Sequence, residues 1–167
     1  RERGAWADAD EPNLREYLDL VALGTIADIV PMVDENRIFV RNGLEELCGA
    51  ARPGIKALKS VCGVGPEEVT VTTVAYRLAP RLNAPGRIAD ASLGVQLLLC
   101  EHFEEAVSLA DKIDLENTRR RKVEGRTLTA AKKQLEPYLD DAALVLASND
   151  WHPGVMGLCA SRLAEEF

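Results

Sequence analysis

The sequence predicts an α/β protein that is predominantly helical over its 167 residues. Apolar residues recur every three to four positions along most of the chain, which is the spacing of amphipathic helices. One short run of consecutive apolar residues, 142–147, has instead the pattern of a buried strand. A composition of 47% apolar and 28% charged residues is typical of globular proteins and excludes collagen-like and disordered classes.

The first third of the chain predicts three helices. The first covers 14–27, because apolar residues recur there after Asn13, a residue that caps helices well, and Pro31 prevents its continuation. A second covers 34–49 and ends at a glycine. A third, shorter helix begins at Arg52.

The middle of the chain is interrupted by prolines. Thr70 or Thr72 can cap a helical segment over 74–78. The next segment, 80–87, holds two prolines and a glycine, so we expect an irregular loop there. Helical spacing resumes over 89–100.

The expected loop contains Arg81, Asn83 and Arg87. A stiff backbone that holds two guanidinium groups and an amide together is suited to binding an anion. The alternative is a surface turn whose arginines are solvated.

A long helix is predicted from Phe103 to Leu135, ended by Pro137. Its apolar face is interrupted between Asp114 and Thr127. A helix packed in one core does not normally have such an interruption, so we expect a helix that bridges two bodies and is partly solvated at its centre.

The last segment predicts a loop and a helix over 154–167 after the strand. Gly154 and Gly157 would let a ligand approach the amino end of this helix, where free N–H groups and the helix dipole favour phosphate. The alternative for His152 is a hydrogen-bonded loop histidine.

Charge is distributed unevenly. The net charge of −7 argues against nucleic-acid binding through overall charge. However, 111–135 carries 8 basic and 4 acidic residues, against 3 and 9 in 1–35, so this segment is suited to meet phosphate. Aromatic residues make up only 5%, and we expect Trp151 and Tyr138 to be the stacking platforms near a cleft.

The four cysteines form no C-x-x-C pair, which indicates buried thiols in a reducing compartment rather than a zinc site or disulfides. No stretch approaches the roughly 18 apolar residues of a membrane span. We therefore expect a cytoplasmic protein without a membrane partner.

Asp28 lies where an almost wholly apolar helix meets Ile29. A carboxylate buried at such a place is costly unless it is paired or bound to metal, so Asp28 is a candidate metal ligand. The alternative is that Asp28 merely caps the following turn.

Three motifs carry a family resemblance: DLVALGTIADIVP (19–31), PRLNAPGR (80–87) and WHPGVMGLCASR (151–162), with shorter matches at 35–37 and 52–55. In this order and spacing they resemble the RecJ family of the DHH phosphoesterase superfamily across nearly the whole chain. That family consists of bacterial exonucleases specific for single-stranded DNA, which degrade from the 5′ end with Mn²⁺ or Mg²⁺.

The resemblance implies roles for individual residues. Asp28 would be the catalytic aspartate and metal ligand of the last metal-binding motif, in a two-metal site of the DHH domain. The residues implied to bind substrate are Arg81, Asn83 and Arg87 at the cleft, Arg120 and Arg121 on the connector helix, and His152, Gly154 and Arg162 after it.

The resemblance also implies an organisation: 1–102 as the end of the DHH catalytic domain, 103–136 as a connector helix, and 137–167 as the start of the DHH-associated domain. The Asp-His-His motif is absent, and Pro85 replaces a residue that is usually small. We therefore expect an internal fragment, inactive alone, of an enzyme of DNA repair and recombination. Its expected partners are single-stranded DNA and repair proteins such as a helicase or a single-strand-binding protein.

Two other functions remain open. One is a DHH phosphodiesterase of short oligonucleotides or cyclic dinucleotides, and the other is a non-catalytic scaffold of the superfamily. The basic connector and the 80–87 motif favour RecJ over the first, and the presence of Asp28 argues against the second.

Overall fold

The computed structural model describes residues 12–139, 141 and 143–167, and these residues form helices and no strand. The prediction of a mainly helical chain is confirmed. The main helices are α1 (Leu18–Ala27), α2 (Asp34–Gly49), α3 (Pro53–Val61), α4 (Val71–Thr73), α5 (Ala79–Ile88), α6 (Ser92–Leu99), α7 (Phe103–Leu135) and α8 (Pro153–Glu166).

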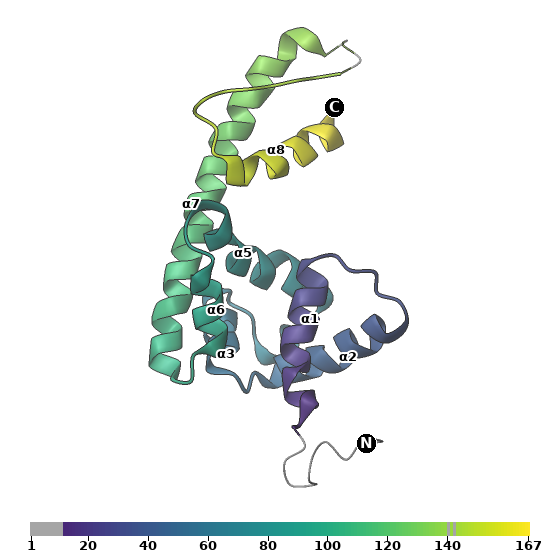
Figure 1. Ribbon diagram of the computed structural model, residues 1–167, viewed down its shortest axis with the longest axis vertical. Helices are drawn as coiled ribbons and strands as arrows, with labels where there is room; N and C mark the ends of the chain where they lie inside the picture. The colour runs from purple at the N-terminus through teal and green to yellow at the C-terminus, as the bar shows by residue number, and fades with distance from the viewer. Residues whose placement is uncertain (1–11, 140, 142) are drawn as a thin grey trace.

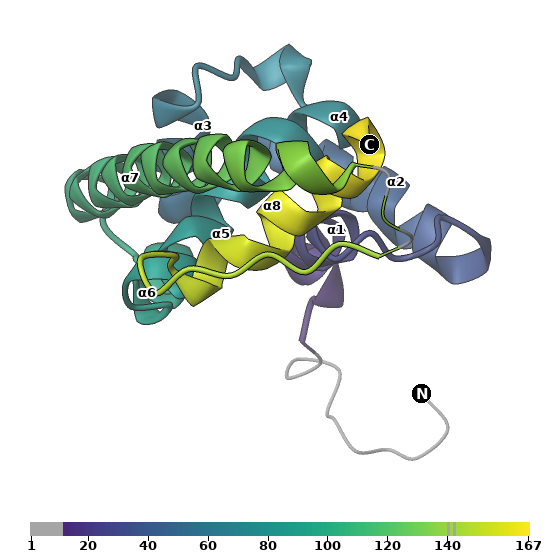
Figure 2. The same cartoon turned by 90° about the horizontal axis from the view of Figure 1, so that it is seen from above.

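Helix α7 runs along the molecule, and α3, α5, α6 and α8 pack against it at different heights (Figure 1). Helices α3, α5 and α6 contact its first half, and α1 and α2 form an antiparallel pair beside them. Helix α8 packs against both α7 and α5 (Figure 2). None of the described helices is both long and apolar enough to span a membrane.

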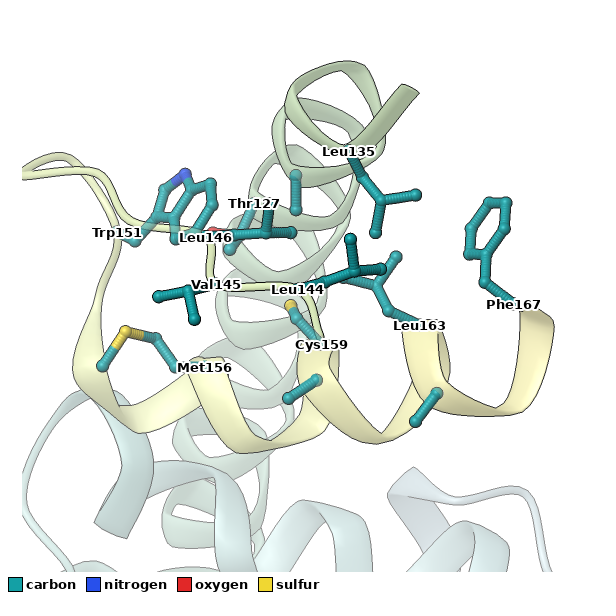
Figure 3. Close-up of a pocket in the computed structure, with 13 residues that line it drawn as sticks. Thr127, Leu135, Leu144, Val145, Leu146, Trp151, Met156, Cys159, Leu163 and Phe167 are labelled. Atoms are coloured by element: carbon teal, nitrogen blue, oxygen red, sulfur yellow. The ribbon is translucent and has the colours of Figure 1, made fainter. Parts of the chain in front are cut away.

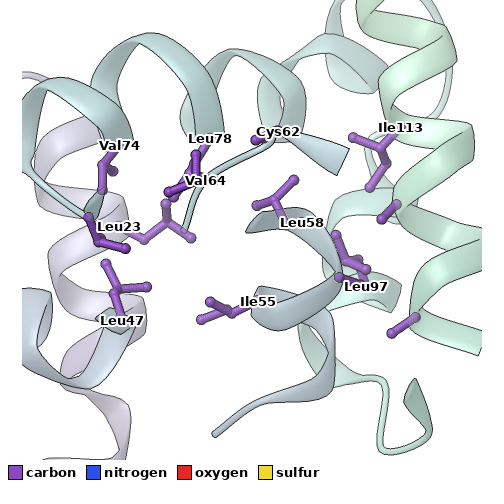
Figure 4. Close-up of a cluster of buried hydrophobic side chains, with 14 of the residues drawn as sticks. Leu23, Leu47, Ile55, Leu58, Cys62, Val64, Val74, Leu78, Leu97 and Ile113 are labelled. Atoms are coloured by element: carbon purple, nitrogen blue, oxygen red, sulfur yellow. The ribbon is translucent and has the colours of Figure 1, made fainter. Parts of the chain in front are cut away.

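The core lies between α1, α2, α3, the helical turn Val74–Leu78, α6 and the first half of α7 (Figure 4). Leu47, Ile55, Leu58, Leu97 and Ile113 are almost fully buried there. Burial of one such side chain contributes about 1.5–3 kcal/mol to the stability of the fold. This cluster therefore fixes how the helices are arranged.

Lys59 and Cys62 are among the polar groups buried at the edge of this core. The ammonium group of Lys59 donates hydrogen bonds to the carbonyls of Leu47 (2.8 Å) and Cys48 (3.0 Å) at the end of α2, and burial lowers its pKa. Burial raises the pKa of the Cys62 thiol to about 11. The expectation of free cysteines is confirmed, with three buried and Cys48 half-buried.

The predicted bounds of the first helices are confirmed. Asn13 caps a 3₁₀ turn, Leu14–Tyr17, with its side chain accepting from the backbone N–H of Arg15, and this turn leads into α1. Helix α2 begins at Asp34 and α3 follows Arg52, as expected. Local capping and periodicity were sufficient signals here.

The irregular loop expected over 80–87 is wrong, because these residues form α5. Thr70 starts a helical run by accepting from the N–H of Thr73, and the run passes through a π-helical turn, Val74–Leu78, into α5. Pro80 comes just after the π-helical turn, so its missing N–H removes one hydrogen bond from this continuous helical run. Pro85 is inside α5 and buried, so core packing offsets its lost hydrogen bond.

The predicted strand over 142–147 is also not formed. Ala142 lies outside the described residues, and 143–147 is chain without regular structure, in which Val145 is 92% exposed. A strand needs a neighbour to satisfy its N–H and C=O groups, and the described residues offer it none.

Helix α7 has the bounds that the sequence predicted, and its centre is partly solvated as expected, but the polar residues on its inner face are buried. Asn117, Glu124 and Thr127 are at most 5% exposed. The polar interruption of the apolar face is therefore buried, and the reason is a cluster of paired charges between α7 and α8.

Candidate functional site

A cavity of about 450 Å³ lies where α5, α7 and α8 meet, next to the end of α1. Six of the predicted substrate-binding residues line it: Arg81, Asn83 and Arg87 from α5, Arg120 and Arg121 from α7, and Arg162 from α8. We call this cavity the arginine pocket. Its volume is in the range of about 300–1,000 Å³ that is usual for ligand sites.

Three of the five arginines are held by carboxylates. Arg81 Nε lies 2.6 Å from Asp114 Oδ1, and Arg120 Nη1 lies 2.6 Å from Glu124 Oε2. Arg162 Nη2 lies 2.9 Å from Glu124 Oε1, at ion-pair distance but without hydrogen-bond alignment. Five guanidinium groups thus face two carboxylates, which leaves an excess of three positive charges in a chain whose net charge is negative.

The remaining two, Arg87 and Arg121, have no carboxylate within 4.0 Å among the described residues. Arg87 Nη1 instead donates to the carbonyl of Gly154 at 3.4 Å. The pKa of Arg120 is lowered, first by burial and then by Arg87, Arg121 and Arg162, against the opposing effect of Glu124. The mutual repulsion of these cations favours binding of an anion in the pocket.

Glu124 lies at the centre of the buried polar cluster. It is 2% exposed, and its Oε2 accepts a hydrogen bond from Arg120 Nη1. The Nη2 group of Arg120 also donates to Asn117 Oδ1 at 2.9 Å. The thiol of Cys159 on α8 lies 3.6 Å from the Glu124 carbonyl oxygen. This cluster joins α7 to α8, so Arg120 serves packing as well as lining the pocket.

Asp28 is exposed, so the burial expected for it is wrong. Its neighbours Ala22, Leu23 and Ile26 carry the buried face of α1, whereas Asp28 is the C-cap one residue beyond the helix. A carboxylate at the C-terminal end of a helix is disfavoured by the helix dipole, and a bound cation would relieve that repulsion.

The backbone beside Asp28 is strained. Ile29 has φ 55°, in the left-handed region that β-branched residues rarely adopt, and its side chain is 88% exposed. Such a conformation costs about 1–3 kcal/mol, and it is found most often at functional sites. The strained turn presents Asp28 to a second hollow of about 430 Å³, which shares Ala27, Ala79 and Asn83 with the arginine pocket.

The described residues do not make a complete metal site. They contain no group of three or more His, Cys, Asp or Glu side chains that could hold an ion. Asp28 can supply one carboxylate ligand, whereas divalent cations of the Mg²⁺ type require several oxygen ligands at once. The metal chemistry implied for the family therefore does not fit these residues alone.

His152 and Gly154 lie outside the lining of the arginine pocket, at the start of α8. His152 is the N-cap of α8, and its Nδ1 accepts from the N–H of Gly154 at 3.1 Å. A Cβ atom on Gly154 would lie 1.9 Å from the carbonyl oxygen of Arg87, so the backbone of α5 fills the space beside this glycine. Gly154 thereby lets α8, which carries Arg162, lie against the end of α5, and His152 caps the start of α8.

Gly154→Ala is expected to destabilise the contact between α5 and α8 by about 1–3 kcal/mol, the usual cost of overpacking. Gly157→Ala is the matched control in the same helix, because a Cβ there meets nothing within 4 Å. It should stabilise α8 by up to about 1 kcal/mol through helix propensity. Hydrogen exchange of α8 in the whole protein measures both changes, and equal protection in the two variants would contradict the close approach.

An apolar groove of about 440 Å³ lies between α7, α8 and the segment 144–146 (Figure 3). Trp151 lines this groove, and Tyr138 follows the end of α7, so neither aromatic residue expected near a cleft lines the arginine pocket. The aromatic residue that does line it, Tyr76, was missed. The signal was its helical spacing of seven residues to Asn83, which the expected loop over 80–87 concealed.

Comparison with known proteins gives one consistent result. No protein-family model matches the chain. The chain is 43% identical over 163 residues to the single-stranded-DNA-specific exonuclease RecJ of Escherichia coli K12, with 93% of this chain and 28% of that protein covered. It is 44% identical over 153 residues to RecJ of Bacillus subtilis 168, with 91% and 20% covered.

The fold gives the same result. The crystal structure of RecJ in complex with Mn²⁺ from Thermus thermophilus superposes with a TM-score of 0.82 at 36% identity, covering 93% of this chain and 23% of that one. The chain thus spans less than a third of the curated relatives it matches. In both sequence and fold, the chain is therefore similar to one portion of RecJ.

Proposed function

We propose that this chain forms part of a metal-dependent exonuclease that degrades single-stranded DNA from its 5′ end. The observation that carries the proposal is the arginine pocket, which has an excess of positive charge and adjoins the hollow of Asp28. Single-stranded DNA offers closely spaced phosphates, and guanidinium groups bind phosphate with two parallel hydrogen bonds. The names of the similar proteins support this substrate.

We assign the segments as the sequence suggested, with 1–102 as the end of the DHH catalytic domain, 103–136 as the connector and 137–167 as the start of the DHH-associated domain. Asp28 would be one ligand of Mn²⁺ or Mg²⁺, the ions named for similar structures. A divalent pair would activate water and stabilise charge on the reacting phosphate. Because the other ligands are not among the described residues, this part alone is expected to be inactive.

The candidate site residues divide into those that bind phosphate and those that hold the helices in position. Arg87 and Arg121, which lack carboxylate partners in the described part of the chain, bind phosphate directly. Arg81 and Arg162 also contact phosphate, oriented by their carboxylates, and Asn83 donates from its amide beside Asp28. Arg120, His152 and Gly154 hold α7 and α8 in position.

The cellular setting is proposed on the same basis. An exonuclease for single-stranded DNA fits DNA repair and recombination in the cytoplasm, where a helicase would expose the strand and a single-strand-binding protein would cover it. The described residues identify no surface for either protein partner.

The binding proposal is tested with Arg121→Ala in the whole protein, measured by fluorescence anisotropy on single-stranded DNA in Ca²⁺ to limit hydrolysis. Each lost phosphate contact lowers the slope of log K against log salt by about 0.7 for single strands. We expect that decrease together with weaker binding. Arg41→Ala is the matched control, because Arg41 is an exposed arginine on α2 outside the arginine pocket.

Arg120 is not used in this test, since its replacement would unpair the buried Glu124. A salt slope that stays unchanged in Arg121→Ala, or one that falls equally in Arg41→Ala, would contradict phosphate binding in the arginine pocket.

A further inference from the structure

The π-helical turn Val74–Leu78 is an unusual feature that the proposed function leaves unused. In this turn the N–H of Ala79 donates to the carbonyl of Val74, so one more residue is accommodated than in an α-helical turn. Turns of this kind are rare, and they occur often at functional sites.

The inner side of the turn is firmly held. Val74 and Leu78 are fully buried in the core. The guanidinium group of Arg77 donates to the carbonyls of Cys62 and Gly63, the second at 3.0 Å, and so ties the turn to the end of α3. The outer side of the turn is therefore presented on a rigid support.

The residue on that outer side is Tyr76, which is 78% exposed. A single exposed tyrosine is ordinary, but this one lines the arginine pocket and is the only aromatic residue among the lining side chains described. Its neighbours in the lining include Arg81, Asn83 and Arg121. The pocket therefore offers guanidinium groups for a phosphate and one flat ring at the same opening.

We infer that Tyr76 is a stacking platform for the base of the nucleotide whose phosphate the arginines bind. This inference rests on the proposed function and extends it from the backbone of the strand to its bases. Every base has a face that can stack on an aromatic ring, so the contact tolerates any sequence. A ring on a rigid turn also loses little conformational freedom on binding.

The test uses the whole protein and 5′-phosphorylated single strands in Ca²⁺, with the dissociation constant measured by fluorescence anisotropy. Tyr76→Ala is expected to weaken binding by about five- to twenty-fold, at the lower end of the effects seen for base stacking. Tyr76→Phe should bind as the unmodified protein does, because the ring is kept. Tyr138→Ala is the matched control, since Tyr138 is exposed and lies outside the pocket lining.

A second set of strands carries one abasic nucleotide, placed in turn at each position from the 5′ end. Stacking predicts one position at which loss of the base weakens the unmodified protein and removes the difference between it and Tyr76→Ala. If that difference persists with every abasic strand, Tyr76 does not stack on a base.

Arg121→Ala separates the two proposals. Weaker binding by Arg121→Ala with unchanged binding by Tyr76→Ala overturns only the stacking platform. Unchanged binding by both variants overturns the proposed nucleic-acid site together with the platform that depends on it.

Discussion

Asp28→Ala in the whole protein is expected to lower nuclease activity on single-stranded DNA by more than about 100-fold while leaving the fold unchanged. Loss of a group that hydrogen-bonds to a metal ligand already lowers metal affinity or activity by about 10–100-fold, and loss of the ligand itself should lower it further. Asp28 is exposed and its side chain makes no hydrogen bond or ion pair among the described contacts, so its removal breaks no packing.

The measurement is digestion of an end-labelled single strand in Mn²⁺, with thermal unfolding followed in parallel. Asp28→Asn tests the charge alone, because it keeps the shape of the side chain, and it should be nearly as inactive. Asp111→Ala is the matched control, since Asp111 is exposed on α7. If Asp28→Ala still removes nucleotides stepwise from the 5′ end, Asp28 is not an essential metal ligand.

Two other outcomes point to the alternative functions. If long strands stay intact while short oligonucleotides or cyclic dinucleotides are cleaved, the protein is a phosphodiesterase of the superfamily. If none of these substrates is cleaved by the unmodified protein in either Mn²⁺ or Mg²⁺, a non-catalytic role is favoured.

The sequence predicted best where local signals decide the structure. Asn13, Thr70 and Pro137 mark helix limits through capping and the missing proline N–H, and these limits hold in the fold. The resemblance grouped Arg81 on α5 with Arg162 on α8, which the fold places around one pocket. Motifs can identify such residues together because residues from several segments contribute to one site.

The sequence failed where the outcome depends on a distant neighbour. Pro85 predicts the end of a helix, yet the helical run that begins at Thr70 continues past Pro85 because the inner face of the run is buried. The sequence predicts a solvated polar centre for α7, because it does not show that Arg162 of another helix pairs with Glu124 there. Burial of Asp28 was inferred from an apolar helix, although the residue lies just beyond the buried face.

Arg120→Ala is expected to destabilise the contact between α7 and α8 by about 3–5 kcal/mol, because it leaves the carboxylate of Glu124 buried without its main partner. Arg162 cannot replace it fully, since its side chain is 58% exposed and its charge is screened by solvent. Hydrogen exchange of α8 in the whole protein should become at least about 100-fold faster. Arg119→Ala is the matched control.

Arg119 is the neighbouring arginine on the same helix, and its side chain is 66% exposed with Glu116 at 3.7 Å. Glu116 is 20% exposed, but the guanidinium of Arg119 is exposed and screened by solvent, so the pair contributes about 0–1 kcal/mol and exchange of α8 should change little in the control. Equal exchange in the two variants would mean that Glu124 is not buried against Arg120 in solution.

The double variant Arg120→Met with Glu124→Leu separates stability from function at the same site. Replacing a buried ion pair by apolar side chains of similar size is often neutral or stabilising, so protection of α8 should return. Arg162 would nevertheless lose the carboxylate that orients it, and binding of single-stranded DNA should stay weaker than in the unmodified protein. Full recovery of both stability and binding would show that Glu124 serves packing alone, because the guanidinium of Arg162 would then reach phosphate without it.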